Sequence, residues 1–266
     1  MTHAAAHQLF WLAGREWVNR WRTRELNLPP LPALGDPRAR RGGATHLFGF
    51  SPSVVPRPAD WGGALHITGY WFLDRETWQP DERLARFLAD GEPPVCVGFG
   101  SMIDARGGEL SEVVMAALKL TGRRAVLVRG WGGAARTEGD VLVIESAPYA
   151  WLYPRVRVAV HHGGTGTVAE ALRAGVFQVT VPFFGEQRFW GRRLRELGVA
   201  PAPIPRERLC ARRLANAIDR AATEPRTRAR AAALGERVRG EDGVARAVEL
   251  IERACGVERR SAAPSE

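Results

Sequence analysis

The 266-residue chain is 45% hydrophobic and 25% charged, a composition typical of a globular protein with a sizeable core. The net charge is +9, and nearly all of the positive charge is carried by arginine. This use of arginine reflects either a genome rich in G and C or a polyanionic partner. The arginines alternate with acidic residues and form no dense basic arm, which argues against nucleic acid as a partner. Three separated cysteines without metal-ligand spacing fit a reducing cytoplasm. No apolar run has the length of a membrane span and no signal peptide is recognisable, so we expect at most peripheral membrane contact.

The chain before residue 81 predicts one helix and two short strands. The helix covers Gln8–Arg24, with an apolar face formed by Leu9, Trp11, Leu12 and Val18. The strands are predicted at Thr45–Phe50 and His66–Leu73, and the proline-containing stretch Ser51–Gly63 between them is predicted to be an extended linker.

From Asp81 onward, compact apolar strands alternate with helices. Strands are predicted at Val95–Phe99, Ala125–Val128, Val141–Ile144, Val156–Val160 and Gln178–Val181, and helices at Glu82–Leu88, Glu109–Leu120, Gly164–Ala174, Gln187–Leu197, Leu209–Ala222, Pro225–Val238 and Gly243–Ala254. The alternation, with nearly continuous apolar strands, indicates an α/β fold in which a parallel sheet is covered by helices on both faces. Such sheets bind ligands beyond the carboxyl ends of their strands.

The segment that follows the strand ending at Val160 has the composition of an anion-binding turn. It reads His161-His162-Gly163-Gly164-Thr165-Gly166-Thr167 and runs into a helix. Glycines let the backbone approach an anion, and the helix N-terminus presents unpaired N–H groups and a positive dipole end. His162, Thr165 and Thr167 add side-chain donors, so we predict a diphosphate cradle rather than a simple helix cap.

Four further loops at the same edge carry weaker signals. Glu186 and Gln187 suit vicinal sugar hydroxyls, or begin a helix that favours an acidic residue. Ser101 either reaches a phosphate or ribose or caps the next turn. Trp131, followed by Gly132, packs on a base or belongs to the core, and the Ser146–Tyr149 stretch frames a base.

Together these motifs resemble the UDP-glycosyltransferase superfamily, and most closely its sterol and lipid glucosyltransferase branch. The resemblance covers roughly Phe48–Val199 and rests on Val97–Met102, Arg129–Gly133, Trp151–Pro154, His161–Thr167, Ala174–Val176 and Val181–Gly191. It implies a GT-B fold with two Rossmann-like domains, of which this chain resembles the C-terminal, donor-binding half. Residues 1–50 would then be a remnant of the acceptor domain, 51–80 an interdomain linker, and 81–258 the nucleotide-sugar-binding domain.

The resemblance also implies which residues hold the donor, without a metal or other cofactor. Diphosphate binding falls to Ser101, His162, Gly164, Thr165, Gly166 and Thr167; nucleoside binding to Trp131, Gly132, Ser146, Tyr149 and Glu170; and sugar binding to Glu186 and Gln187. The chain departs from the family pattern at three positions. Glu186 replaces the usual Asp, Phe177 a usual Pro, and Ser146 stands where plant relatives stack a Trp on uracil.

The implied activity is transfer of a hexosyl group, expected to be glucose from UDP-glucose, to a hydroxyl of a lipophilic acceptor such as a sterol, lipid or natural product, with inversion. The family's catalytic base is a His of the N-terminal acceptor domain, so we assign no catalytic residue in this chain. Two alternatives stay open: a split-enzyme or non-catalytic partner that needs a separate N-terminal-type chain for turnover, and a basic nucleic-acid binder, which would show steep salt dependence.

Overall fold

A computed structural model gives the fold and describes residues 3–35, 45–73, 78–100, 102, 108–129 and 137–256. The chain forms two compact units that interleave in sequence. The smaller contains residues 1–48, 58–67 and 251–266, and the larger contains residues 49–57 and 68–250. No helix in the described ranges is long and apolar enough to cross a membrane. The predicted division at residues 50 and 80 remains a prediction.

The smaller unit contains helix α1 (His3–Arg24) and a parallel pair of short strands, β1 (His46–Phe48) and β2 (Leu65–Ile67). The predicted apolar face of α1 is wrong, because Leu9, Leu12 and Val18 are 55%, 49% and 39% exposed. The side of α1 that contacts the returning chain carries polar donors instead. Asn19 exchanges two hydrogen bonds with the Leu31 backbone, at 2.9 and 2.8 Å.

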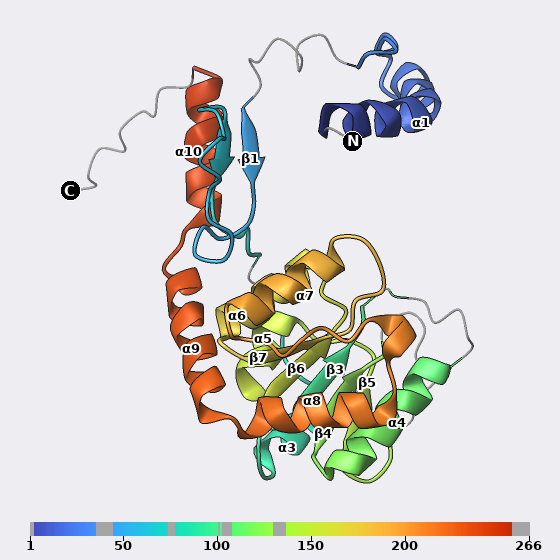
Figure 1. Cartoon of the computed structure of the whole chain (residues 1–266), viewed down its shortest axis with the longest axis vertical. Helices are drawn as coiled ribbons and strands as arrows, with labels where there is room; N and C mark the ends of the chain where they lie inside the picture. The colour runs from blue at the N-terminus through green and yellow to red at the C-terminus, as the bar shows by residue number, and fades with distance from the viewer. Residues whose placement is uncertain are drawn as a thin grey trace, which may run out of the picture. The chain divides into compact units, whose positions relative to one another are not determined.

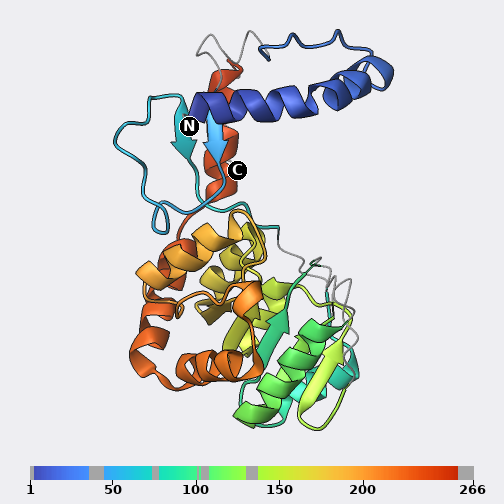
Figure 2. The same cartoon turned by 45° about the vertical axis from the view of Figure 1, so that its right-hand side comes forward.

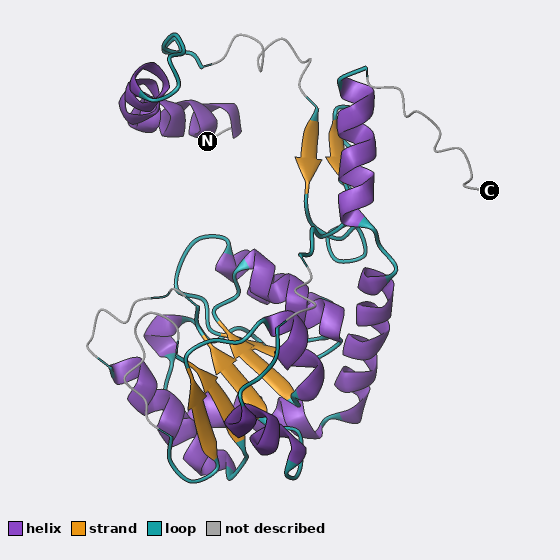
Figure 3. Ribbon diagram, turned by 180° about the vertical axis from the view of Figure 1, so that it is seen from behind, coloured by secondary structure: helices purple, strands orange, loops and turns teal. Residues whose placement is uncertain are grey.

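The larger unit is built on a five-stranded parallel sheet (Figures 1 and 3). Its strands are β3 (Val95–Gly98), β4 (Ala125–Val128), β5 (Val141–Ile144), β6 (Val158–His161) and β7 (Phe177–Thr180), in the order β5-β4-β3-β6-β7. All five predicted strands are present and differ from the prediction by at most two residues at an end.

The helices of the larger unit agree with the prediction to within about one turn. They are α3 (Glu82–Ala89), α4 (Glu109–Thr121), α6 (Thr165–Ala174), α7 (Gln187–Glu196), α8 (Ala211–Thr223), α9 (Pro225–Arg239) and α10 (Gly243–Ala254), the last of which continues into the smaller unit. The short helix α5 (Tyr149–Leu152) and two 3₁₀ turns, Tyr153–Arg155 and Arg206–Arg208, were not predicted. Segments this short carry too little periodicity for a sequence pattern to reveal them.

Alternate residues of each strand face opposite layers of helices, as the period of two requires. Val95, Val97 and their neighbours on one face pack against α4 and α8, which lie side by side across it (Figure 2). Cys96 and its neighbours on the other face pack against α3, α5 and α6. Burial on both faces explains why the strands have nearly continuous apolar sequences.

The strand order reverses between β3 and β6. From β3 the chain proceeds outward through β4 and β5, and then returns to β6 on the other side of β3. In parallel sheets the loops at such a reversal diverge and leave a crevice at the carboxyl ends of the two strands. The fold therefore places the loop after Gly98 and the loop after His161 on either side of the expected ligand crevice.

Candidate functional site

The turn from β6 into α6 lies on one side of this crevice. Gly163 has a φ of +90°, and a Cβ there would lie 3.1 Å from the carbonyl oxygen of Gln187, so both conformation and space require glycine. Gly164 precedes the first helical residue, Thr165. The first N–H groups of a helix have no partner within it, so the amides of Gly164 and of the three residues that follow it form a row of donors.

The His162 ring lies against Gly164, at the start of this row of amides. A Cβ on Gly164 would be 2.4 Å from His162 Nε2, and a Cβ on Gly100 would be 3.4 Å from His162 Cε1. The imidazole thus lies between the loop after β3 and the start of α6. Burial lowers its pKa below the usual value, and the nearby Glu186 carboxylate partly offsets the effect. The ring is neutral at neutral pH, and its buried Nδ1 has no hydrogen-bond partner within the described ranges.

Thr165, Gly166 and Thr167 begin the helix as predicted. The Thr165 hydroxyl oxygen accepts a 2.9 Å bond from the Trp190 indole N–H, which ties the start of α6 to α7 and leaves the hydroxyl hydrogen for another acceptor. Nothing stands within 4 Å of the position where a Cβ on Gly166 would lie. The first turn of α6 is therefore anchored from beneath and open beside Gly166.

A buried polar group lies beneath the turn and was missed as a functional element by sequence reasoning. His161 is fully buried, its Nδ1 accepts a 3.1 Å bond from the Gly163 N–H, and its Nε2 lies 2.9 Å from the Gln178 amide oxygen. Since Nδ1 accepts a hydrogen bond, Nε2 must carry the proton and donate it. Burial lowers the pKa of His161 to about 3, so the ring is neutral. The available signal was Gln178, a polar residue in a strand whose neighbours are apolar.

The loop after β7 supplies the two residues predicted to bind sugar. Glu186 is exposed and lies within electrostatic reach of His162. Gln187 is buried, and its amide oxygen accepts bonds from the backbone N–H groups of Phe183 at 2.8 Å and Phe184 at 3.4 Å. Its amide nitrogen donates to the sulfur of Met102 at 3.6 Å, in the loop after β3. Gln187 therefore fixes the shape of its own loop and joins it to the loop after β3.

Two predicted nucleoside contacts follow β5. Ser146 is exposed and lines a hollow of about 530 Å³ together with Trp78, Arg129 and other residues at the ends of β4 and β5. Tyr149 stacks on Tyr153 with ring centroids 4.5 Å apart. Burial raises the pKa of Tyr149. Ser146 is free to meet a ligand, whereas one face of the Tyr149 ring is already covered.

Glu170 lies on the middle turn of α6 and is ion-paired to Arg173 at 3.0 Å, with both side chains largely buried. A ribose at this carboxylate would share it with the guanidinium. Ser101, Trp131 and Gly132 lie outside the described residues. The ribose role of Glu170 and the predicted contacts of those three residues stay predictions.

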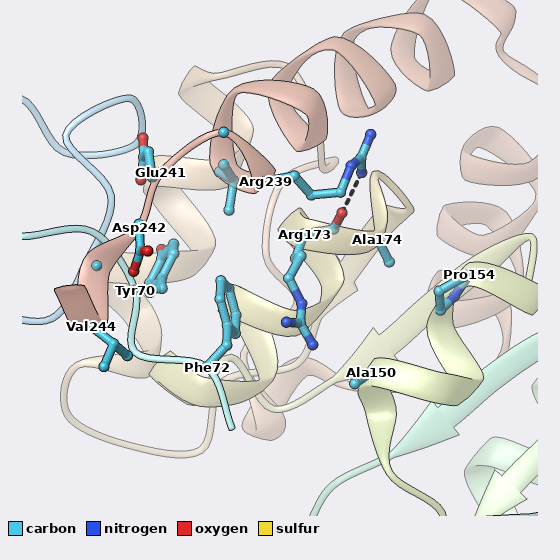
Figure 4. Close-up of a pocket in the computed structure, with 13 residues that line it drawn as sticks. Tyr70, Phe72, Ala150, Pro154, Arg173, Ala174, Arg239, Glu241, Asp242 and Val244 are labelled. Carbon is cyan, nitrogen blue, oxygen red and sulfur yellow. Dashed lines mark hydrogen bonds between the residues drawn. The ribbon is translucent and has the colours of Figure 1, made fainter. Parts of the chain in front are cut away.

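A second, larger hollow of about 830 Å³ lies at the opposite end of α6 (Figure 4). Tyr70 and Phe72 line it, and the Arg173 guanidinium lies 4.1 Å from the centre of the Phe72 ring. The ten-residue helix separates this hollow from the turn at His162 by about 15 Å. It is therefore distinct from the crevice at the carboxyl ends of the strands.

The geometry is that of an anion site with polar side chains around it. A row of helix N-terminal amides, a neutral imidazole and threonine hydroxyls can hold a diphosphate by hydrogen bonds. Within the ranges that the structure describes, no three His, Cys, Asp or Glu side chains are grouped so as to hold a metal ion.

Comparison with known proteins finds relatives over nearly the whole chain. Residues 133–253 match the family model "Erythromycin biosynthesis protein CIII-like, C-terminal domain". The chain is 46% identical over 259 residues to O-mycaminosyltylonolide 6-deoxyallosyltransferase of Streptomyces fradiae, and covers 59% of that protein. It is also 36% identical over 261 residues to sterol 3-beta-glucosyltransferase UGT80B1 of Arabidopsis thaliana, of which it covers 42%. The two alignments each include 95% of this chain. Almost the whole chain is therefore similar to part of each of these two glycosyltransferases, and it spans less than two thirds of either.

Solved glycosyltransferase structures show that the chain has the GT-B fold. The crystal structure of CalG4, the calicheamicin glycosyltransferase, aligns with 99% of this chain and 62% of its own, with a TM-score of 0.67 and 21% identity. Arabidopsis thaliana UGT89C1 complexed with UDP aligns with 79% of this chain and 66% of its own, with a TM-score of 0.60 and 16% identity. The predicted fold and the family resemblance are both confirmed.

Proposed function

We propose that this domain binds a UDP-sugar at the β6–α6 turn and supplies the leaving-group half of a glycosyl transfer. The observation that carries the proposal is His162, whose Nε2 lies on the side of Gly164, at the N-terminus of α6. A phosphate oxygen held by the α6 amides would accept a hydrogen bond from this Nε2.

Each side of the crevice has a part in this proposal. The amides of Gly164, Thr165, Gly166 and Thr167 would hold the diphosphate together with His162 and stabilise its growing charge as the glycosidic bond to UDP breaks. Ser146 and the hollow at the ends of β4 and β5 would take the uridine. Glu186, exposed beside His162, would accept hydrogen bonds from sugar hydroxyls.

The finer assignment follows the relatives. UDP as the nucleotide is supported by the UDP complex of UGT89C1, and glucose as the sugar by the sterol 3-beta-glucosyltransferase relatives. An acceptor hydroxyl on a sterol, lipid or macrolide-like product is supported by the same relatives and by the 6-deoxyallosyltransferase. Attack from the face opposite UDP would give inversion.

A second candidate is that turnover requires an acceptor domain supplied by another chain. Helix α1 exposes Phe10, Trp17 and Trp21 by 82%, 78% and 56%. Exposed aromatic side chains along one helix are typical of a surface that a partner covers. The two candidates differ only in the origin of the general base that deprotonates the acceptor hydroxyl.

Calorimetric titration with UDP-glucose, UDP and ADP tests the proposal. We expect UDP and UDP-glucose to bind with similar affinity and ADP at least tenfold more weakly, since the uridine subsite selects the base. The His162→Ala variant should lose most of the affinity, whereas His7→Ala, an exposed histidine on α1, should bind as the wild type does. Equal binding of UDP by the His162→Ala variant would refute the site.

A further inference from the structure

We propose that His161 is a positioning residue that sets the conformation of the diphosphate-binding turn without touching the ligand. The inference rests on the proposed donor site and concerns a side chain that the function does not otherwise use. His161 has no exposed surface, and both of its ring nitrogens are engaged within the protein. It therefore cannot contribute a second imidazole contact to a diphosphate.

The hydrogen bond from Gly163 explains what the ring does. A side-chain acceptor that binds the N–H two residues further along the chain closes a local turn, as Asn and Asp do in Asx-turns. Here His161 Nδ1 accepts from Gly163 N at 3.1 Å, and Gly163 has a φ of +90°. With the Gly163 amide directed inward, the turn is closed and the amides from Gly164 onward begin the helix and face the crevice.

Gln178 holds the ring in the tautomer that this turn requires. Its amide oxygen lies 2.9 Å from Nε2, so the imidazole proton stays on Nε2 and Nδ1 remains an acceptor. Residues 161 and 180 are register partners on β6 and β7, which sets Thr180 and Gln178 on the face of the sheet that carries His161. The buried Gln178 side chain thus keeps Nδ1 of His161 a hydrogen-bond acceptor.

Two substitutions separate this role from mere filling of the core. In Asn, the amide oxygen lies one bond beyond Cγ, as Nδ1 does in histidine, so His161→Asn keeps the acceptor for Gly163 and leaves a larger void. In Gln, the polar end reaches the position of Nε2, so His161→Gln fills more space and keeps the contact with Gln178 but loses the acceptor. Positioning predicts that Asn is the better replacement, whereas core filling predicts Gln.

The experiment compares UDP affinity and the amide NMR spectrum of the free protein in the wild type and both variants. We expect His161→Asn to bind UDP within about threefold of the wild type and His161→Gln to bind about fivefold to tenfold more weakly, the effect of one hydrogen bond. In the free protein, the amide chemical shifts of Gly164–Thr167 should be the same in His161→Asn as in the wild type. They should differ from the wild type in His161→Gln. Direct support would be a scalar coupling between Gly163 N and His161 Nδ1 in the wild type.

The results distinguish the inference from the function on which it rests. If the wild type fails to bind UDP, the proposed function falls, while the coupling and the amide shifts still decide whether His161 sets the turn. If the wild type binds UDP and the Gln variant binds as well as or better than the Asn variant, the positioning role is refuted.

Discussion

Gly164 leaves the space that His162 occupies, so adding one methyl group there probes the site with little else disturbed. Its φ of −65° and ψ of 143° are open to any residue, so Gly164→Ala brings no backbone strain. The new Cβ would lie 2.4 Å from His162 Nε2 and 3.2 Å from Cδ2. The ring must therefore move by more than half an ångström, away from the amides of α6.

The cost follows from the hydrogen bond that the displaced ring can no longer make. A hydrogen bond to a charged group contributes about 1.5–3 kcal/mol, and a misplaced group loses much of it. We therefore expect Gly164→Ala to weaken UDP binding by about tenfold to a hundredfold, close to the effect of His162→Ala. Calorimetric titration measures the loss, and urea unfolding should give a free energy within about 1 kcal/mol of the wild type.

A double variant isolates the mechanism. Once the imidazole is absent, the methyl group has nothing to displace, so the double variant Gly164→Ala, His162→Ala should bind no more weakly than His162→Ala alone. Gly63→Ala is the matched control, since nothing lies within 4 Å of its Cβ position and it lies in the smaller unit. Wild-type affinity in Gly164→Ala, or additive losses in the double variant, would refute this account of the turn.

Three other predictions concern pH and packing. Burial lowers the pKa of His162, whereas a bound diphosphate favours the charged imidazole, so binding takes up a proton. Calorimetric titrations should therefore find that UDP-glucose binds more tightly as the pH is lowered from 8 to 6. A pH-independent affinity of the wild type contradicts this, and the His162→Gln variant should show such a pH-independent affinity. The pKa of His161 is about 3 in the folded state, below its unfolded value, so the unfolded state binds the extra proton and stability falls as the pH falls. This one group should lower the free energy of unfolding by about 2 kcal/mol between pH 7.5 and 5, as measured by urea unfolding. The His161→Asn variant should lack this dependence of stability on pH. Gly235→Ala would place a Cβ 2.8 Å from the Gly175 Cα and force α6 and α9 apart. We expect the free energy of unfolding, measured with urea, to fall by about 1–3 kcal/mol. An unchanged unfolding midpoint would contradict the contact.

The sheet could be predicted from the sequence because its signals are local. The strands at Ala125–Val128 and Val141–Ile144 have the predicted ends, since short apolar runs between polar turns leave few other choices. The start of α6 was equally predictable, because glycines and threonines before an apolar helical pattern mark a helix N-terminus. Since parallel sheets bind ligands beyond the carboxyl ends of their strands, the sequence also predicted that His162 lies at the ligand site.

What the sequence did not reveal depends on contacts between distant segments. Gln187 was assigned to sugar hydroxyls, but only the fold shows that its amide oxygen holds the Phe183 and Phe184 amides of its own loop. Likewise, the pairing of His161 with Gln178 needs two strands in register. The apolar face assigned to α1 was wrong because polar side chains such as Asn19 hold the returning chain there.

The central claim is that the amides at the start of α6 and His162 hold the diphosphate of a UDP-sugar. It is tested most directly by titrating ¹⁵N-labelled protein with UDP and following the amide resonances. The account predicts that the largest shifts occur at Gly164, Thr165, Gly166 and Thr167, saturate together, and vanish in His162→Ala at the same UDP concentration. Saturable shifts confined to the hollow around Tyr70 and Phe72, with the α6 amides unmoved, would contradict it.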